Sequence, residues 1–206
     1  MRLAIGMLPT KVEADIILHP IKYKNSITYE PLGEEAVVAL IVKELTYNVV
    51  DDKVREFFDE MDDGYLYSES NFDEFDIETI KNSLDEKNSL IIGKDIYFHP
   101  KRDIILKLIN LLKLVNFEIK DSISDTDFEE IDELDSFDGV VVYLDDEEHN
   151  DILISPQFKV AHKINSDTIK IDGKKKNVIL DENLKGVFAI VGEKSDEYPF
   201  KRVKIQ

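Results

Sequence analysis

The stretch Ser89–Ile119 reads SLIIGKDIYFHPKRDIILKLINLLKLVNFEI, and it decides the fold class. Leu90–Ile92 is a short apolar run that ends at Gly93, which is typical of a buried strand. Lys101–Val115 is apolar except for one narrow polar stripe, and this pattern predicts a helix that packs against a sheet. Phe117–Ile119 predicts the next strand. The order strand, helix, strand predicts an α/β fold with a Rossmann-like parallel sheet and flanking helices.

The same sheet is expected to continue after this stretch. Gly139–Leu144 (GVVVYL) is another continuous apolar run, and we expect it to lie in parallel beside Leu90–Ile92 and Phe117–Ile119. Earlier in the chain, Ala14–Leu18 predicts a strand. Helices are predicted over Gly33–Thr46, Asp51–Met61 and Phe75–Leu84, where apolar residues recur with helical spacing.

The last part of the chain has the pattern of a small β unit. The dipeptide Asp172–Gly173 predicts a hairpin turn. Short strands are predicted over Ile152–Ile154, Phe158–Ile164, Thr168–Ile171, Val178–Leu180, Val187–Val191 and Phe200–Ile205. We therefore expect two domains. Residues 1–150 would form the α/β domain with an N-terminal helical part, and residues 151–206 a small β-barrel-like unit packed on it.

The charge of the chain limits its partners. The 206 residues include 44 Asp and Glu against 26 Lys and Arg, which gives a net charge of −18. Such a field repels nucleic acid and anionic membrane surfaces, so we expect neither as a direct partner. The longest uncharged apolar run, Ala36–Val42, is too short to span a membrane. A cytoplasmic location is expected, and attachment to a membrane would require a partner protein.

No complete motif for a cofactor, a metal or a catalytic group is present. The chain has no cysteine, which excludes iron–sulfur clusters and Cys-ligated zinc. It also lacks GxxxxGK[ST], GxGxxG and HExxH. Asp59–Ser70 and Asp125–Ser136 resemble calcium loops but end in Ser where the bidentate Glu is needed. We therefore expect no cofactor, no metal and no catalytic residue.

One weak candidate remains for a ligand crevice. In parallel α/β sheets, ligands bind at the carboxyl ends of the strands. If Leu90–Gly93 and Gly139–Leu144 share a sheet, the groups near their ends would face a common crevice. These candidate groups are Gly93, Lys94, His99, Asp145 and His149. The alternative for Asp145–His149 (DDEEH) is an acidic surface loop that leaves the strand.

The stretch Ser89–Ile119 resembles a segment of the molybdopterin-oxidoreductase-like subunit of bacterial NADH-quinone oxidoreductase (complex I). The matching residues are Gly93, Tyr97, Phe98, His99 and Pro100. Two shorter stretches, Tyr29–Leu45 and Tyr198–Ile205, are similar to the opening helix of the molybdopterin-oxidoreductase-like region and to its C-terminal strand. The resemblance implies a truncated form of that subunit without the cluster-binding part, and a fold that is kept without its cofactor. It also implies a small C-terminal β-barrel.

The function expected from these observations is non-catalytic. The chain would be an accessory or structural component of the peripheral arm of a respiratory complex, and its partners would be other subunits of that complex. Two rivals stay open. One is a free-standing ligand-binding protein or enzyme that uses the crevice, and the other is an acidic adaptor that binds a basic protein through Asp121–Asp151.

Overall fold

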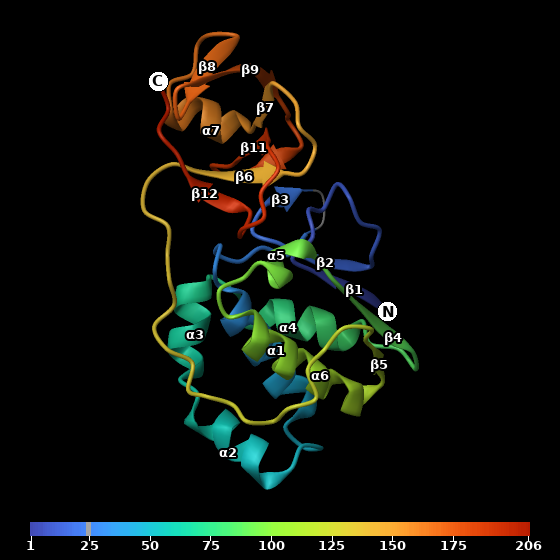
Figure 1. Cartoon of the computed structure of the whole chain (residues 1–206). Coiled ribbons are helices and arrows are strands. Elements are labelled where there is room, and N and C mark those ends of the chain that lie inside the picture. Colours follow the sequence, from blue (N-terminus) through green and yellow to red (C-terminus); the bar gives the residue numbers. More distant parts are fainter. Residues whose placement is uncertain (24–25) are drawn as a thin grey trace. The chain divides into compact units, whose positions relative to one another are not determined.

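The computed structural model describes residues 1–23 and 26–206, which form two compact units. Unit 1 consists of Met1–Pro20 and Ile27–Ser136, and unit 2 consists of Ile21–Ser26 and Phe137–Gln206. Figure 1 shows the order of the elements along the chain. Each unit has a hydrophobic core of its own.

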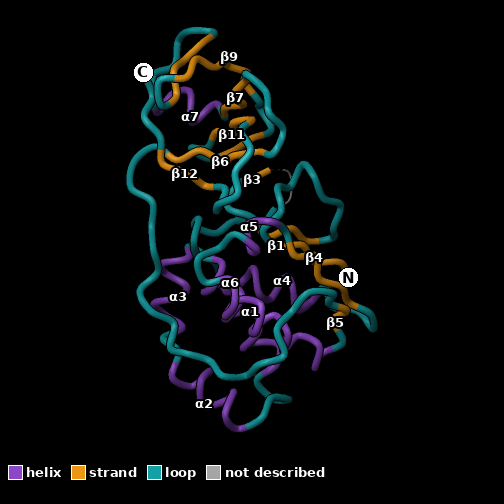
Figure 2. Tube along the Cα trace, in the orientation of Figure 1, coloured by secondary structure: helices purple, strands orange, loops and turns teal. Residues whose placement is uncertain are grey.

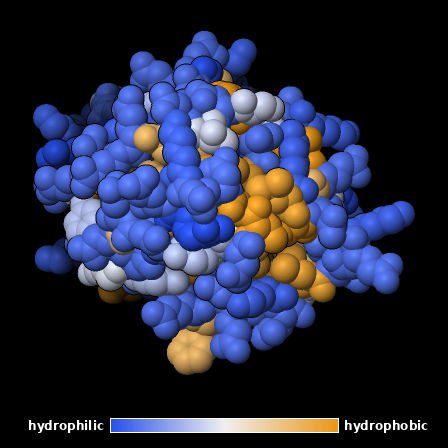
Figure 3. Space-filling view, turned by 90° about the horizontal axis from the view of Figure 1, so that it is seen from below, coloured by the Kyte–Doolittle hydropathy of each residue, from blue (hydrophilic) through white to orange (hydrophobic). Residues whose placement is uncertain are grey.

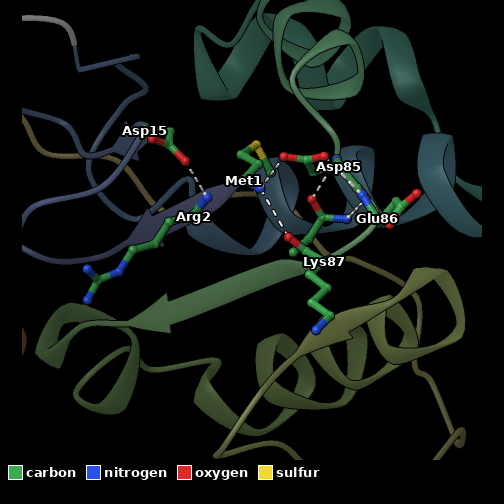
Figure 4. Close-up of polar contacts among 7 residues, drawn as sticks. Met1, Arg2, Asp15, Asp85, Glu86 and Lys87 are labelled. Atoms are coloured by element: carbon green, nitrogen blue, oxygen red, sulfur yellow. Dashed lines mark hydrogen bonds and ion pairs between the residues drawn. The ribbon is translucent and has the colours of Figure 1, made fainter.

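Unit 1 is built on a four-stranded parallel sheet, here called sheet A. Its strands lie in the order β2 (Ile16–Leu18), β1 (Arg2–Ile5), β4 (Asn88–Ile92), β5 (Phe117–Glu118). All three pairings are parallel. The N-terminus is held at the start of β1, because the Met1 amine donates to the Lys87 carbonyl oxygen at 3.1 Å (Figure 4). This sheet and its helices confirm the predicted fold class.

The helices of unit 1 largely follow the predicted ranges. The buried helix α1 (Glu34–Thr46) lies at the centre of the core. Asp residues cap the next three helices, and each cap side chain accepts a backbone N–H of the first turn. The remaining helices are α2 (Asp52–Glu60), α3 (Asp63–Ser70), α4 (Glu74–Asn82), α5 (Lys94–Tyr97), α6 (Arg102–Leu111) and a 3₁₀ turn (Leu112–Val115).

These helices cover one face of sheet A. The crossover from β2 to β4 contains α1 to α4, and the crossover from β4 to β5 contains α5 and α6. Both run in the same direction across the sheet, so right-handed crossovers place both sets of helices on the same face. The crossover from β1 to β2 runs the other way and is a loop without a helix. Figure 2 shows the strands along one side of the helical layer.

The burial of the strands follows from this arrangement. Leu3, Ile5 and Leu90 point to the helices and belong to the core of unit 1. On the other face, Ile17 and Ile91 flank the small Ala4 in register, and both isoleucines stay half-buried. We call this second side the helix-free face of sheet A.

Unit 2 is a curled sheet of six strands, here called sheet C. Its order is β12 (Phe200–Arg202), β6 (Val141–Asp145), β11 (Ala189–Gly192), β7 (Asp151–Ile154), β9 (Lys174–Leu180), β8 (Thr168–Ile171). Beyond β12, Ile205 forms an antiparallel bridge with Ile171 of β8, the strand at the opposite edge. The sheet therefore curls into a half-barrel, as expected for a barrel-like unit. A separate pair, β3 (Lys22–Tyr23) and β10 (Leu184–Lys185), completes the unit.

Two predictions about the last third of the chain are wrong. Val140–Tyr143 does not lie beside β4 and β5, because β6 pairs in sheet C with β11 and β12. Phe158–Ile164 is not a strand, because helix α7 (Pro156–Ala161) takes up most of it. The Ser155 side chain caps this helix by accepting the Phe158 N–H, and Pro156 suits its first turn.

The division of the chain also differs from the expected boundary at residue 151. Unit 2 begins at Phe137 and takes in Ile21–Ser26 from the N-terminal region. No helix in the described part of the chain is long and apolar enough to cross a membrane.

Candidate functional site

The place in unit 1 where the topology favours a ligand is the carboxyl edge of β1 and β4. The chain leaves β1 toward β2 on one side and leaves β4 toward β5 on the other. Such a switch point usually opens a crevice between the two diverging loops. Gly6 follows β1 and Gly93 follows β4, so these turns decide whether a crevice forms here.

The two turns close against each other. The Gly93 N–H donates to the Ile5 carbonyl oxygen at 2.8 Å, and the Asp95 N–H donates to the Gly6 carbonyl oxygen at 3.1 Å. A Cβ at Gly93 would lie 2.0 Å from the Gly6 oxygen, and a Cβ at Gly6 would lie 2.8 Å from Cγ1 of Ile96. Gly93 is therefore required for backbone contact between the turns, and the fully buried Ile96 packs against Gly6.

A buried pair of a histidine and an aspartate lies beside these turns. Nε2 of His19, directly after β2, is 3.0 Å from Oδ2 of Asp95 in α5, and both side chains are fully buried. The pair links the ends of β2 and β4, the two strands that flank β1. Burying polar groups costs free energy unless they are paired, and the short distance between these two side chains provides that pairing.

A second buried pair fixes the turn after α5. Nε2 of His99 lies 3.3 Å from Oε2 of Glu34 in α1. The Lys101 N–H donates to Nδ1 of His99 at 3.0 Å. Nδ1 of His99 thus faces the Lys101 backbone, while Nε2 faces the Glu34 carboxylate. The Tyr29 hydroxyl reaches the other oxygen of Glu34 at 3.4 Å.

Glu35 follows Glu34 in the chain, and the pKa of its carboxyl is raised. Burial raises the pKa of the Glu35 carboxyl, and the charges of Lys101 and His99 partly oppose the rise. Glu35 also lines an open cavity of about 270 Å³ with Lys101, Arg102 and Glu130. The side chain is 3% exposed, so it touches this cavity without entering it.

In unit 2, His149 and Gly192 hold the loop after β6 in place. A Cβ at Gly192 would lie 2.5 Å from Cγ of His149, so the imidazole packs directly on the Gly192 backbone. The Asp151 N–H donates to Nδ1 of His149 at 3.3 Å. The buried Lys176 ammonium donates to the His149 carbonyl oxygen at 3.0 Å, which closes the loop. These contacts give His149 a structural role.

The five candidate residues do not belong to one sheet edge. Gly93, Lys94 and His99 lie in unit 1, whereas Asp145 and His149 lie in unit 2. The crevice hypothesis assumed that β4 and β6 share a sheet, and they do not. Within unit 1, Gly93 serves the turn contact and His99 the pair with Glu34.

The His19–Asp95 pair was not found from the sequence. The necessary signal was β1, whose short run ends at Gly6 and is soon followed by Pro9. With β1 placed between β2 and β4, the residues after the flanking strands are expected to converge.

Metal binding gains no support from the described residues, in which no group of three or more His, Asp or Glu side chains is placed to hold an ion. Comparison of the chain with family models, with curated proteins and with solved structures found no significant match.

Proposed function

We propose that the chain is a non-catalytic accessory component that docks onto other proteins through the helix-free face of sheet A. The observation that carries the proposal is the one-sided covering of a parallel sheet. All-parallel sheets almost always have both faces covered, because their strands are apolar on both sides. In this chain, no helix of the β1–β2 crossover supplies the second layer.

The chemistry of this face suits a protein partner. Its centre is apolar: Ile17 and Ile91 are half-buried there, in register on either side of the fully buried Ala4. A shallow depression of about 390 Å³ lies there, and its lining includes Arg2, Ser89, Ile91, Tyr97 and Glu118. An apolar centre with a charged rim is the usual composition of a protein–protein interface.

Arg2 is the clearest polar contributor to the rim. Its backbone N–H donates to the Asp15 carboxylate at 2.6 Å, while its guanidinium points away from Asp15 and Asp85 (Figure 4). Figure 3 shows hydrophobic residues gathered in one patch on a mainly hydrophilic face of the molecule.

The closed switch point supports the non-catalytic part of the proposal. The turns after β1 and β4 contact each other, and Ile96 packs against Gly6 beside the His19–Asp95 pair. The titratable groups at this edge are thus used to fix the turns. The strand order at this edge is that of a switch point, where ligands often bind. Here the two turns contact each other directly.

We further propose that the partners are subunits of the peripheral arm of a respiratory NADH-quinone oxidoreductase. The support is the resemblance of Ser89–Ile119 to the molybdopterin-oxidoreductase-like subunit of that complex. In this proposal the protein lies in the cytoplasm and reaches the inner membrane only through its partners.

Co-purification from native membranes tests both parts. The tagged wild-type chain should bring down subunits of the respiratory complex. Ile91→Asp, on the helix-free face, should reduce their recovery at least about tenfold, since a buried apolar contact becomes an unpaired charge. Phe75→Asp is the control, because Phe75 is 74% exposed on α4 in the helical layer.

Three results would decide against parts of the proposal. Equal loss in the two variants would remove the helix-free face as the docking site. Capture of basic proteins from outside the respiratory chain would favour the acidic adaptor. A chain that brings down no respiratory subunit but binds a small ligand stoichiometrically would favour the ligand-binding alternative.

A further inference from the structure

The segment Asp121–Ser136, here called the acidic strap, lies across the helical layer of unit 1. Apart from a bend at Asp121, it has no helix, strand or turn, and it follows β5 along α6, α2 and α3 (Figure 2). It contains no Lys or Arg. Such a segment has to be held by its side chains, since no sheet or helix fixes its backbone.

Lysines of the helical layer hold the strap through its aspartates. Lys107 of α6 lies 2.7 Å from Asp125, and Lys53 of α2 lies 2.8 Å from Asp127. Lys107 also donates to the Asp127 carbonyl oxygen at 3.0 Å. A third pair joins Lys101 to Asp132 at 3.4 Å. The partner carboxylates raise the pKa values of Lys53 and Lys107, and Lys107 lowers that of Asp125.

Apolar side chains of the strap anchor it between these pairs. Ile123, Phe128, Ile131 and Leu134 are half-buried against the core of unit 1. The ring of Phe128 stacks on Phe57 of α2 with centroids 4.8 Å apart. A small cavity of about 80 Å³ remains beside Ile131, so packing there is incomplete.

The backbone of the strap adds little. The Ile123 N–H donates to the Leu106 carbonyl oxygen at 3.3 Å, and the Leu134 N–H donates to the Tyr65 hydroxyl at 2.9 Å. Segments with few backbone hydrogen bonds and few buried contacts open at lower free energy than the core. The strap has few backbone hydrogen bonds and none of its residues is fully buried, whereas α1 beneath it is almost wholly buried.

We propose that the acidic strap is an electrostatic latch, which opens and closes over the groove of α2, α3 and α6 while unit 1 stays folded. Closed, the latch covers Phe57 and Tyr65 and neutralises three lysines. Open, it exposes that groove. Two of the pairs, Lys53–Asp127 and Lys101–Asp132, are solvent-exposed on both sides, so salt screens them effectively. The Lys107 side chain is less exposed, at 21%.

Hydrogen exchange of the full chain, followed by mass spectrometry, tests the latch. Raising sodium chloride from about 0.02 M to about 0.5 M shortens the screening length several-fold, and strap amides should exchange roughly threefold faster or more. Peptides from α1 should not change. The variant Lys53→Gln/Lys101→Gln/Lys107→Gln should show the faster strap exchange already at low salt.

A matched control separates the latch from a general effect of charge. Lys43→Gln/Lys81→Gln/Lys174→Gln removes the same charge from three lysines whose carboxylate partners, Asp63, Glu44 and Glu193, lie outside the strap. It should leave strap exchange at the wild-type rate. The proposal would be overturned if the exchange rate of the strap amides changed neither with salt nor in the first variant. It would also be overturned if the α1 amides exchanged faster together with those of the strap. The wild-type salt series decides the matter even if the triple variant does not fold.

Discussion

At the residue scale, two glycines determine what the carboxyl edge of sheet A can do. Gly6 takes a positive φ of 66°, and Gly93 leaves room for the Gly6 carbonyl group. A side chain at Gly93 would force the turns after β1 and β4 apart, and one at Gly6 would clash with Ile96. The sequence shows Gly93 at the end of a strand, but it cannot show that Gly6 is the neighbour that requires it.

Gly93→Ala tests this contact. The new Cβ would lie 2.0 Å from the Gly6 oxygen, so β1 and β4 must separate, and unfolding free energy should fall by about 3 kcal/mol or more. Gly64→Ala is the control, because its Cβ would meet only the Asp62 side chain at 3.4 Å. In helix α3 that change should stabilise by about 0.5 kcal/mol. Denaturant unfolding measures both, and equal effects would contradict the contact.

Glu35 gives a prediction about pH. Because burial raises its pKa in the folded state, the protonated form is favoured there, and the stability it confers is present at low pH. That stability is lost as pH rises from the ordinary value of 4.5 through the folded pKa. Glu35→Gln should therefore have a higher melting temperature than the wild type at pH 7, with the gap closing toward pH 4.5.

The control for this pH dependence is Glu56→Gln, an equal charge change at an exposed position on α2. Its difference from the wild type should stay small across the same range. A Glu35→Gln variant that melts below the wild type at pH 7 would show that the attraction of Lys101 and His99 outweighs the cost of burial.

At the element scale, most helices and strands could be predicted from the local sequence, whereas the pairing of strands far apart in the chain could not. The unit β4–α6–β5 was predicted because its strands are joined by one short helical crossover. Ile105, Leu108 and Leu112 are buried in it, whereas Val115 is half-buried. β6 was assigned to the wrong sheet, because an apolar run indicates a buried strand but does not indicate which strands it pairs with. Helix α7 was missed because apolar residues roughly alternate in Phe158–Ile164, as in a strand. Ser155 and Pro156 are nevertheless typical of the start of a helix.

The candidate site was harder to predict for the same reason. Each of its pairs joins residues far apart in the sequence, such as His19 with Asp95 and Glu34 with His99. The meeting of His19 with Asp95 depends on β1, a strand that was not predicted from the sequence. The hairpin at Asp172–Gly173, by contrast, was predicted from two residues, and both have the positive φ that such turns require.

The place of β6 in sheet C gives a prediction about fragments. β6 lies between β12 and β11, so a fragment of residues 151–206 lacks a central strand and leaves β12 without its partner. A fragment of residues 137–206 retains β6. We expect cooperative thermal unfolding, followed by circular dichroism, for the longer fragment alone. Two fragments with the same transition would show that β6 is not needed for sheet C.

At the scale of the whole molecule, the acidic chain combines two units with separate cores. Its helical layer is covered in part by the acidic strap, while the opposite face of sheet A has no helices. The net charge of −18 favours solubility and disfavours phosphate-rich partners. Two features support the proposed role in assembly with other proteins. Sheet A carries helices on one face only, and the turns at its carboxyl edge contact each other.

The most direct test of that role is photo-crosslinking of the full chain in native membranes. A benzophenone side chain would replace Ile91 on the helix-free face and, in a second variant, Phe75 in the helical layer. The account predicts a crosslink from position 91 to a subunit of the respiratory complex and none from position 75. Crosslinks from position 75 alone, or none to a respiratory subunit from position 91, would contradict it.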